Sequence, residues 1–587
     1  MDTPGNGITL EELEKKETAR MKEETPACGK EKYELGNMAL VAGTFDYLGL
    51  EDLIDKNVGK TGSHVKVNIG GLVKALSMQM LHINYQSLMN TASFMTDIPC
   101  EALLRKGVTP DAFNRTELSR MLDDIYAFGT EQLFILCAKQ VFDRLGITPH
   151  EVHIDSTSFH YDGQTREEEG CELILNKGYS RDHRPELNQA ISVMLTDGSS
   201  HIPLWGKNVS GNVSDNTSFL NAVSDSMPLL RKQFSELKYL VGDSALCTDP
   251  ILKKAAKDGI LIVTRLPDKT DLAKKCFGML DKNKLKPVYE RQAEGEAPEL
   301  GMWCGIQEYY GTKLRLMLVK NTERRASKQK TVEKRANKEL ASLNSKLRTL
   351  WTQPCICMAD AKKAVAKLES KLRLCRIDSV EYKEVQKNAK PGRPKKGETS
   401  EKVTVCVKVK AKTSIDSDKL AAAVDNEILY VIATNDLERN WTMGELLSTY
   451  RRQSVIERCW RCCKNPKMMV DAIYLQKPSR IDALLWLMEI ALLVYAALEF
   501  RVRKVMNEKG LKLTGAENRK NTRPTGEFLL KYVSYLGIAL IRNQTTGKWT
   551  VANRTEEFCD LLSALGHEWM KYYLNDHYKF MSDQAAV

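Results

Sequence analysis

Four polar side chains recur at helical spacing between residues 450 and 464. They are Tyr450, Gln453, Glu457 and Lys464. Steps of three, four and seven place them along one stripe of a predicted α-helix, with apolar residues free to bury the other side. Glu457 and Lys464 would lie about 10 Å apart along the helix axis. This geometry suits a metal ligand and a phosphate clamp acting on one polymeric substrate, although a surface helix with scattered charges gives the same pattern.

Two predicted strands end in an aspartate. The first contains Val152-His-Ile-Asp155, and the second reads Tyr239-Leu-Val-Gly-Asp243. A carboxylate at the end of a core strand costs several kcal/mol to desolvate unless it is paired or bound to a metal. Strand ends are also where ligands bind in open α/β sheets. For each aspartate alone, a strand-end cap or a turn residue is the alternative interpretation.

Asp155, Asp243 and Glu457 together make a ligand set that contains only oxygen. Such a set favours magnesium or manganese over zinc. Two ions about 4 Å apart could activate a water or a 3′ hydroxyl and stabilise the leaving oxygen in phosphoryl transfer. A structural zinc site is the competing hypothesis, and its cysteines would come from two clusters about a hundred residues apart. These cysteines are Cys355, Cys357, Cys459, Cys462 and Cys463.

The basic charge is concentrated in one segment. The chain has 587 residues and a net charge of +11, and residues 320–396 alone hold 22 Lys and Arg against 8 Asp and Glu. This pattern is expected of a protein that touches a polyanion with a dedicated element. At its end, residues 390–397 form an extended basic peptide with Arg393, Lys395 and Lys396, which could lie in a minor groove or serve as a linker.

The surrounding pattern predicts an α/β protein with several domains. Strands at 151–161, 189–196, 201–209, 238–241 and 260–266, with helices at 215–230 and 250–257, describe a mixed sheet. Further strands are predicted at 302–310, 314–320, 403–409 and 428–434, and leucines at coiled-coil spacing predict an antiparallel helical hairpin near 340–372. That hairpin could contact DNA or act as a solvated spacer.

The expected order of domains follows from these patterns. It is a polar tail (1–36), a helical N-terminal domain (37–148) that could bind DNA ends, the first part of a core (149–267), an insertion (268–439), the second part of the core with the Glu457 helix (440–510) and a C-terminal helical region (511–587). The apolar run 483–498 is short for a membrane span and contains Glu489, which favours a buried core helix.

The combined motifs resemble the DDE transposases of bacterial insertion sequences, in the branch with a Tyr-Arg-Glu-Lys helix signature. The motifs are Ile-Asp155-Ser-Thr, Val-Gly-Asp243-Ser and the Tyr450, Gln453, Glu457, Lys464 series, supported by the fragments 211–215, 264–267 and 433–436. The resemblance implies an RNase H-like mixed-sheet core interrupted by a β-strand and helical-hairpin insertion. One departure is that Gln453 stands where the family has arginine.

The resemblance also implies a function. The expected protein is a transposase that binds the ends of a mobile element and cuts and joins DNA. Two Mg²⁺ or Mn²⁺ ions would be held by Asp155, Asp243 and Glu457, and Tyr450, Gln453 and Lys464 would contact DNA. Expected partners are double-stranded element ends, target DNA and a second copy of the chain, with no membrane, in the bacterial cytoplasm at the nucleoid. The alternatives are a catalytically silent DNA-binding derivative and a metal-dependent nuclease without strand joining.

Overall fold

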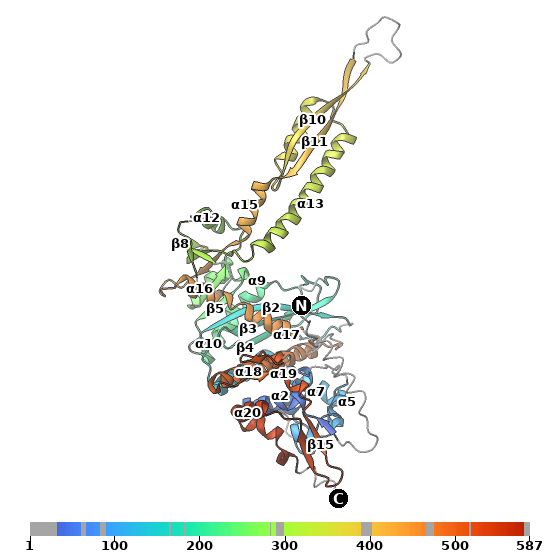
Figure 1. Cartoon of the computed structure of the whole chain (residues 1–587), viewed down its shortest axis with the longest axis vertical. Helices are drawn as coiled ribbons and strands as arrows, with labels where there is room; N and C mark the ends of the chain where they lie inside the picture. Colours follow the sequence, from blue (N-terminus) through green and yellow to red (C-terminus); the bar gives the residue numbers. More distant parts are fainter. Residues whose placement is uncertain are drawn as a thin grey trace, which may run out of the picture. The chain divides into compact units, whose positions relative to one another are not determined.

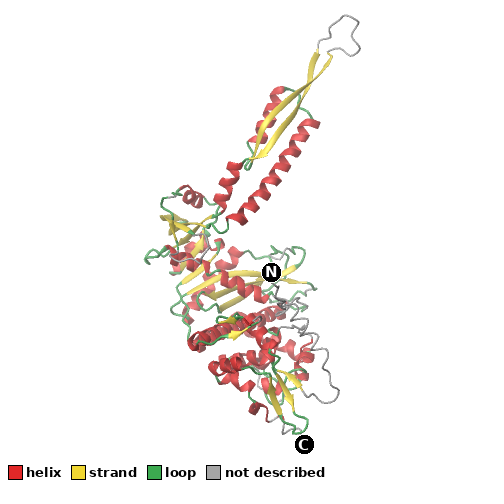
Figure 2. Cartoon of the chain, in the orientation of Figure 1, coloured by secondary structure: helices red, strands yellow, loops and turns green. Residues whose placement is uncertain are grey.

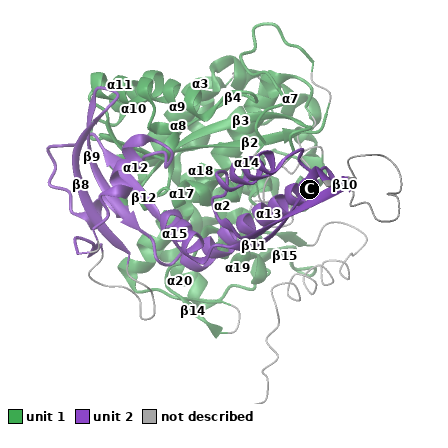
Figure 3. Cartoon of the chain, turned by 90° about the horizontal axis from the view of Figure 1, so that it is seen from above, with its two compact units in different colours: residues 1–264, 449–587 green, residues 265–448 purple. Residues whose placement is uncertain are grey.

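The computed structural model describes residues 32–59, 66–82, 90–163, 166–180, 184–281, 283–288, 299–388, 402–464, 475–515, 518–579 and 581. The chain forms two compact units (Figure 3). Unit 1 comprises residues 1–264 and 449–587, and unit 2 comprises residues 265–448. The regions expected as the N-terminal domain and the C-terminal region lie in unit 1, as do the two expected parts of the core except residues 265–267 and 440–448, which fall in unit 2 with the expected insertion 268–439.

The sheet of unit 1 is built around β2 (Figure 1). Its strands are β2 (Glu151–Tyr161), β3 (Asn188–Asp197), β4 (Pro203–Ser210), β5 (Tyr239–Gly242) and β6 (Leu261–Arg265). They lie in the order β4-β3-β2-β5-β6, with β2 antiparallel to β3 and parallel to β5. All five strands were predicted from their apolar runs. The mixed sheet confirms the predicted RNase H-like α/β class.

Helices connect these strands. They are α9 (Asp215–Asn221), a π-helical segment (Ala222–Ser226) and α10 (Met227–Gln233) before β5, then the short 3₁₀ helix η4 (Ser244–Leu246) and α11 (Asp249–Asp258) before β6. The side chain of Ser214 caps α9 by accepting a hydrogen bond from the Thr217 amide, a common helix start. The helix predicted at 215–230 is therefore present, with a π-helical stretch in its middle.

Helix α18 (Pro478–Lys509) is the core helix of unit 1. Among the described helices it alone is long and apolar enough to cross a membrane, and 89% of its apolar stretch is buried inside the protein, as in a core helix. Burial raises the pKa of Glu489 well above its ordinary value, and Ser192 donates a hydrogen bond to its carboxyl group. Gly206 of β4 permits the approach, because a Cβ there would lie 2.5 Å from Glu489 Oε2.

The N-terminal part of unit 1 is helical, as predicted. It contains α2 (Gly36–Leu48), α3 (Leu50–Val58), α4 (Ile69–Met80), α5 (Thr91–Met95), α6 (Cys100–Leu103), η2 (Pro110–Phe113), α7 (Arg115–Phe128) and α8 (Thr130–Leu145). The C-terminal part contains β13 (Leu513–Thr514), β14 (Lys520–Asn521), α19 (Gly526–Tyr535), β15 (Ala539–Arg542), β16 (Trp549–Ala552), α20 (Glu556–Leu565), α21 (His567–Met570), η6 (Lys571–Tyr573) and η7 (Asn575–Tyr578).

The two ends of unit 1 are joined by a small sheet. Strand β1 (Lys32–Glu34) pairs with β15, which pairs with β16. Residues 32–36, which were predicted as the end of a polar tail (1–36), therefore belong to the folded part of unit 1, and Leu35 is fully buried. Strand β1 was not predicted, because its three residues are too few to show an alternating pattern and charged residues surround them.

A buried lysine also ties these ends together. Lys74 is almost fully buried, and its Nζ lies 2.5 Å from Asp46 Oδ1 and 3.5 Å from Glu51 Oε2. Lys571 approaches Asp46 from the C-terminal side at 2.7 Å. Burial raises the pKa of Asp46, but Lys74 and Lys571 outweigh burial, so the net pKa is lower than usual. The carboxylate is therefore held ionised by its two lysines.

We expect Lys74→Met to lower the free energy of unfolding by about 3 kcal/mol, because it leaves a buried carboxylate without a principal partner. Urea unfolding of the variant measures the loss. Lys66→Met is the matched control, since the Lys66–Asp111 pair is exposed and should contribute little. Equal stability of the two variants would contradict the role assigned to Lys74.

Unit 2 contains a four-stranded segment and a helix-backed hairpin (Figure 2). The segment has the order β12-β9-β8-β7, from β7 (Lys286–Pro287), β8 (Leu300–Tyr309), β9 (Thr312–Lys320) and β12 (Leu429–Thr434). The other elements are α12 (Asp271–Gly278), α13 (Arg325–Thr352), α14 (Met358–Glu369), β10 (Cys375–Asn388), β11 (Lys402–Ile415) and α15 (Ser417–Glu427), with α16 (Met443–Arg451) leading back to unit 1.

The predicted pair of basic helices is present, but it has a third component. Leu343 and Leu347 of α13 and Val365 of α14 share one core with Val407 and Val409 of β11. The helices therefore pack on a long β-hairpin, and its strand β10 was not predicted. That strand carries many charged residues, because one of its faces is exposed.

Candidate active site

The helix expected from Tyr450 to Lys464 is two helices. Helix α16 ends at Arg451, and α17 (Ser454–Cys463) begins after a turn at residues 452 and 453. Tyr450 therefore belongs to α16, Gln453 precedes the first turn of α17, and Lys464 follows its last. The single-helix prediction was wrong because the turn directs Arg452 and Gln453 onto β2, a tertiary contact that spacing does not reveal.

Polar contacts fix the start of α17 to β2. Gln453 Nε2 donates a 2.8 Å hydrogen bond to the Ile154 carbonyl, and its Oε1 lies 3.2 Å from His153 Nδ1. The Arg452 guanidinium forms an ion pair with Glu151 at 3.1 Å. Gln453 was predicted to contact DNA, and the structure shows its amide engaged by strand β2.

Aromatic contacts fix the other end of α17 to the same strand. The Trp460 ring lies against Phe159 with centroids 6.4 Å apart, and Lys464 Nζ lies 5.9 Å from the Phe159 centroid. The ends of α17 thus meet Ile154 and Phe159 in that order, so the helix runs along β2 in the same direction. Glu457 lies between these two contacts, beside the part of β2 that begins at Asp155.

Asp155 lies on the sheet face that α17 covers. Its cross-strand partner on β3 is Met194, and paired residues on neighbouring strands share a face. Met194 packs with Ile456 of α17 and Leu492 of α18 in one buried cluster. The described contacts therefore bring Asp155 and Glu457 to the same face of the sheet.

Asp243 follows the neighbouring parallel strand at the same level. His153 pairs with Val241 in the β2–β5 ladder, and Asp155 and Asp243 each come two residues later. Neighbouring strands lie about 4.8 Å apart. Asp243 Oδ1 also accepts a 2.9 Å hydrogen bond from the Ala245 amide, so it caps η4. A carboxylate accepts through two oxygens, so this cap is compatible with a metal ligand.

The three carboxylates are more accessible than the sequence pattern suggested, and Asp155 lies within β2 rather than at its end. Asp155 is half-buried, while Asp243 and Glu457 are exposed. The expectation that these acids are desolvated was therefore wrong: Asp155 lies within β2 and is only half-buried, while Asp243, after β5, and Glu457, on α17, lie at the surface of unit 1. Accessible carboxylates at one level can instead meet a substrate in solution.

The three carboxylates supply oxygen ligands, the type that magnesium and manganese prefer. These ions take oxygen ligands, and Mg²⁺ in phosphoryl transfer is often held by one or two carboxylates together with substrate phosphates and waters. In the described part of the chain, no three His, Cys, Asp or Glu side chains are close enough to hold an ion by themselves. Asp155 and Asp243, on adjacent strands at one level, match the smaller carboxylate set.

The cysteines of α17 pack in the hydrophobic core of unit 1. Cys459 and Cys463 are buried in the cluster that includes Met194 and Leu492. Burial raises the pKa of Cys459 to about 12. A zinc site requires thiolates, so these thiols favour packing over the zinc interpretation.

Several neighbours of the carboxylates were not found by sequence reasoning. Glu151, His153 and Arg452 hold the Gln453 turn against β2. The sequence could have pointed to them only through their positions, because Glu151 and His153 lie close to Asp155 and Arg452 precedes Gln453. Arg393, Lys395 and Lys396, the predicted DNA contacts of the insertion, lie outside the described residues.

Comparisons with known proteins identify the family. No curated protein matches the chain. A solved structure of the piggyBac transposase synaptic complex with hairpin DNA aligns over 85% of this chain and 79% of that chain, at 10% identity and a TM-score of 0.36, a likeness that supports no further conclusion. Residues 31–138 match a family described as a domain of unknown function, DUF4277. Residues 149–494, more than half of the chain, match the family described as "Transposase DDE domain". The chain therefore belongs to the DDE transposases, the family that its carboxylate motifs resemble.

Proposed function

We propose that this chain cuts and joins DNA at the ends of a mobile element by metal-dependent phosphoryl transfer. One observation carries the proposal: Asp155 within β2 and Asp243 directly after the adjacent parallel strand β5 lie at one level, on a sheet whose α17-covered face also receives Glu457. Membership of the DDE transposase family supports it.

The carboxylates and the basic residues have separate tasks in this proposal. Two bound Mg²⁺ or Mn²⁺ ions would supply Lewis acidity and lower the pKa of an attacking water or 3′ hydroxyl. Asp155, Asp243 and Glu457 would hold and orient these ions. Lys464, which directly follows α17, would hold a phosphate of the DNA strand as a point charge.

Gln453 takes a positioning role in the proposal in place of a DNA contact. Its two contacts with β2 flank the backbone that leads into Asp155, and Glu457 lies one helical turn further along α17. Partners that orient a metal ligand without binding the metal commonly affect metal affinity or activity. Tyr450 remains a proposed DNA contact at the end of α16.

The DNA partner and the second protein copy follow from the reaction. An element has two ends, so a pair of chains, one at each end, is the proposed synaptic assembly. The basic insertion, including Arg393, Lys395 and Lys396, would add contacts to DNA that do not depend on its sequence. The proposed setting is the bacterial nucleoid.

The test is a mini-element that carries its native flanking ends. With Mg²⁺ the protein is expected to nick or release the element at its boundaries and to join the freed ends to a target plasmid, which sequencing of the junctions detects. Binding without any cut would support the silent DNA-binding derivative. Cutting without joined products would support a nuclease.

A further inference from the structure

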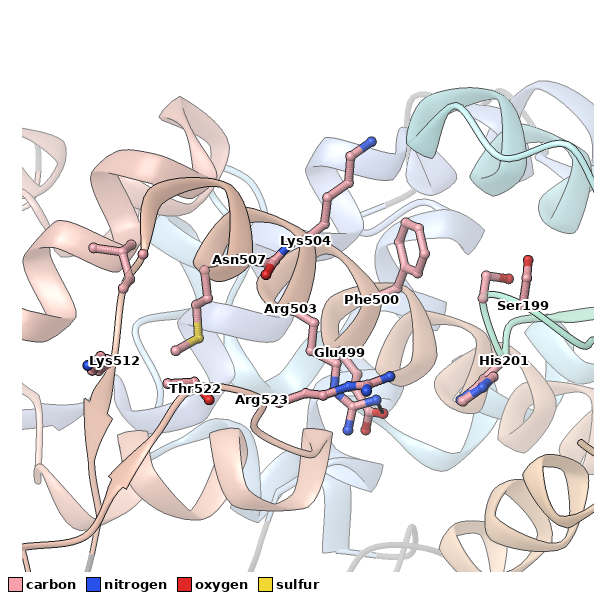
Figure 4. Close-up of a pocket in the computed structure, with 14 residues that line it drawn as sticks. Ser199, His201, Glu499, Phe500, Arg503, Lys504, Asn507, Lys512, Thr522 and Arg523 are labelled. Atoms are coloured by element: carbon pink, nitrogen blue, oxygen red, sulfur yellow. Dashed lines mark ion pairs between the residues drawn. The ribbon is translucent and has the colours of Figure 1, made fainter. Parts of the chain in front are cut away.

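Two linked cavities lie beside the candidate active site in unit 1. The first has a volume of about 740 Å³ and includes Glu457 and Lys464 in its lining. The second has a volume of about 600 Å³ and is lined by the C-terminal half of α18 and the segment around Arg523 (Figure 4). Both are lined by Ser200, His201 and Glu499. We call the two together the α17–α18 groove.

The groove is lined by many cations. The first cavity contains Arg458, Arg461 and Lys464, and the second contains Arg503, Lys504, Lys512 and Arg523. These side chains come from α17, from α18 and from the chain after α18. They are spread along both cavities, which suits a chain of negative charges better than one compact anion.

The carboxylates of the groove are already neutralised in part. Glu499 forms an ion pair with Arg503 at 2.5 Å and accepts a 2.6 Å hydrogen bond from the Gly526 amide. Glu527 forms an ion pair with Lys531 at 3.0 Å. The exposed Lys504 and Arg523 therefore contribute to a positive potential in the second cavity.

His201, at the junction of the cavities, responds to this potential. Burial, together with the charges of Arg458, Arg503 and Arg523, lowers its pKa to about 4. The three arginines come from both cavities, so one positive field extends through the groove. His201 is neutral near pH 7 and adds no charge of its own.

We propose that the α17–α18 groove binds the sugar–phosphate backbone of an unpaired DNA strand leading away from Glu457. The inference rests on the proposed function and names a substrate segment for the same site. Cavities of this size enclose groups of small-ligand scale, which fits a single strand better than a whole duplex. Phe500 lines the second cavity, and basic grooves with aromatic side chains are typical of single-strand binding.

The test measures binding of a single-stranded oligonucleotide in EDTA, where no cutting interferes. We expect Lys504→Ala/Arg523→Ala to weaken binding and to flatten the slope of log affinity against log salt by roughly 1.4, at about 0.7 per lost contact on a single strand. The matched control is Lys509→Ala/Lys548→Ala, which removes two exposed lysines of unit 1 that line neither cavity.

Three results would overturn the proposal: equal slopes for the two double variants, no binding of the single strand by the wild-type chain, or equally effective competition by a duplex of the same length. Failure of the proposed function gives a different pattern. In that case the mini-element would stay uncut in Mg²⁺, while the comparison of double variants in EDTA could still give the expected difference.

Discussion

Asp155→Asn is expected to cut element ends at least about a thousandfold more slowly than the wild-type chain while binding them with equal affinity. The amide removes a charged metal ligand, and a metal ion contributes several kcal/mol to such a reaction. About 4 kcal/mol corresponds to a factor of roughly a thousand in rate. The variant removes no cation, so the affinity for phosphates should persist.

Asp243→Asn and Glu457→Gln should behave in the same way, because the three carboxylates are proposed to hold the same ions. Cleavage of a labelled mini-element in Mg²⁺ gives the rates, and a mobility shift in EDTA gives the affinities. Glu508→Gln is the control, since Glu508 is an exposed acid of α18 that lines neither cavity. A near wild-type rate for any one of the three would remove that residue from the site.

Gln453→Ala should lower the cutting rate by roughly tenfold to a hundredfold, the usual effect of losing a residue that orients metal ligands. The variant loses the hydrogen bond to the Ile154 carbonyl and the contact with His153, so α17 is no longer fixed beside Asp155. We expect the Mg²⁺ concentration for half-maximal activity to rise while DNA affinity stays unchanged. A titration of activity with Mg²⁺ measures this shift.

Lys464→Ala is the contrasting variant for this experiment. Lys464 lies at the other end of α17 and is proposed to hold a phosphate, so its loss should weaken DNA binding and leave the Mg²⁺ requirement in place. If Gln453→Ala instead weakens DNA binding with an unchanged Mg²⁺ response, the original interpretation of Gln453 as a DNA contact is supported.

The five strands of the unit 1 sheet, β2 to β6, could be predicted because each contains a short apolar run bounded by turn residues, whereas the strands of the predicted helical C-terminal region, β13 to β16, were missed. Asp155 and Asp243 could be chosen for the same reason, since each stands at or near the end of such a run. Their common level could not be predicted, because it depends on the pairing of β2 with β5, two strands separated by about eighty residues.

The break between α16 and α17 could not be predicted either, because it also depends on contacts between residues far apart in the sequence. Helical spacing describes one element, whereas the turn is held by Glu151 and Ile154, about 300 residues earlier in the chain. Strand β10 was missed because the residues on its exposed face are mostly charged, and β1 was missed because its three residues are too few to show an alternating pattern.

The position of unit 2 between β6 and α17 has a consequence for biosynthesis. A ribosome makes both aspartates early, then all of unit 2, and only afterwards α17 with Glu457. At about 5–20 residues per second, the interval between Asp243 and Glu457 is roughly ten to forty seconds. A nascent or prematurely terminated chain therefore carries two of the three proposed metal ligands and none of α18, so we expect an incomplete product to cut no DNA.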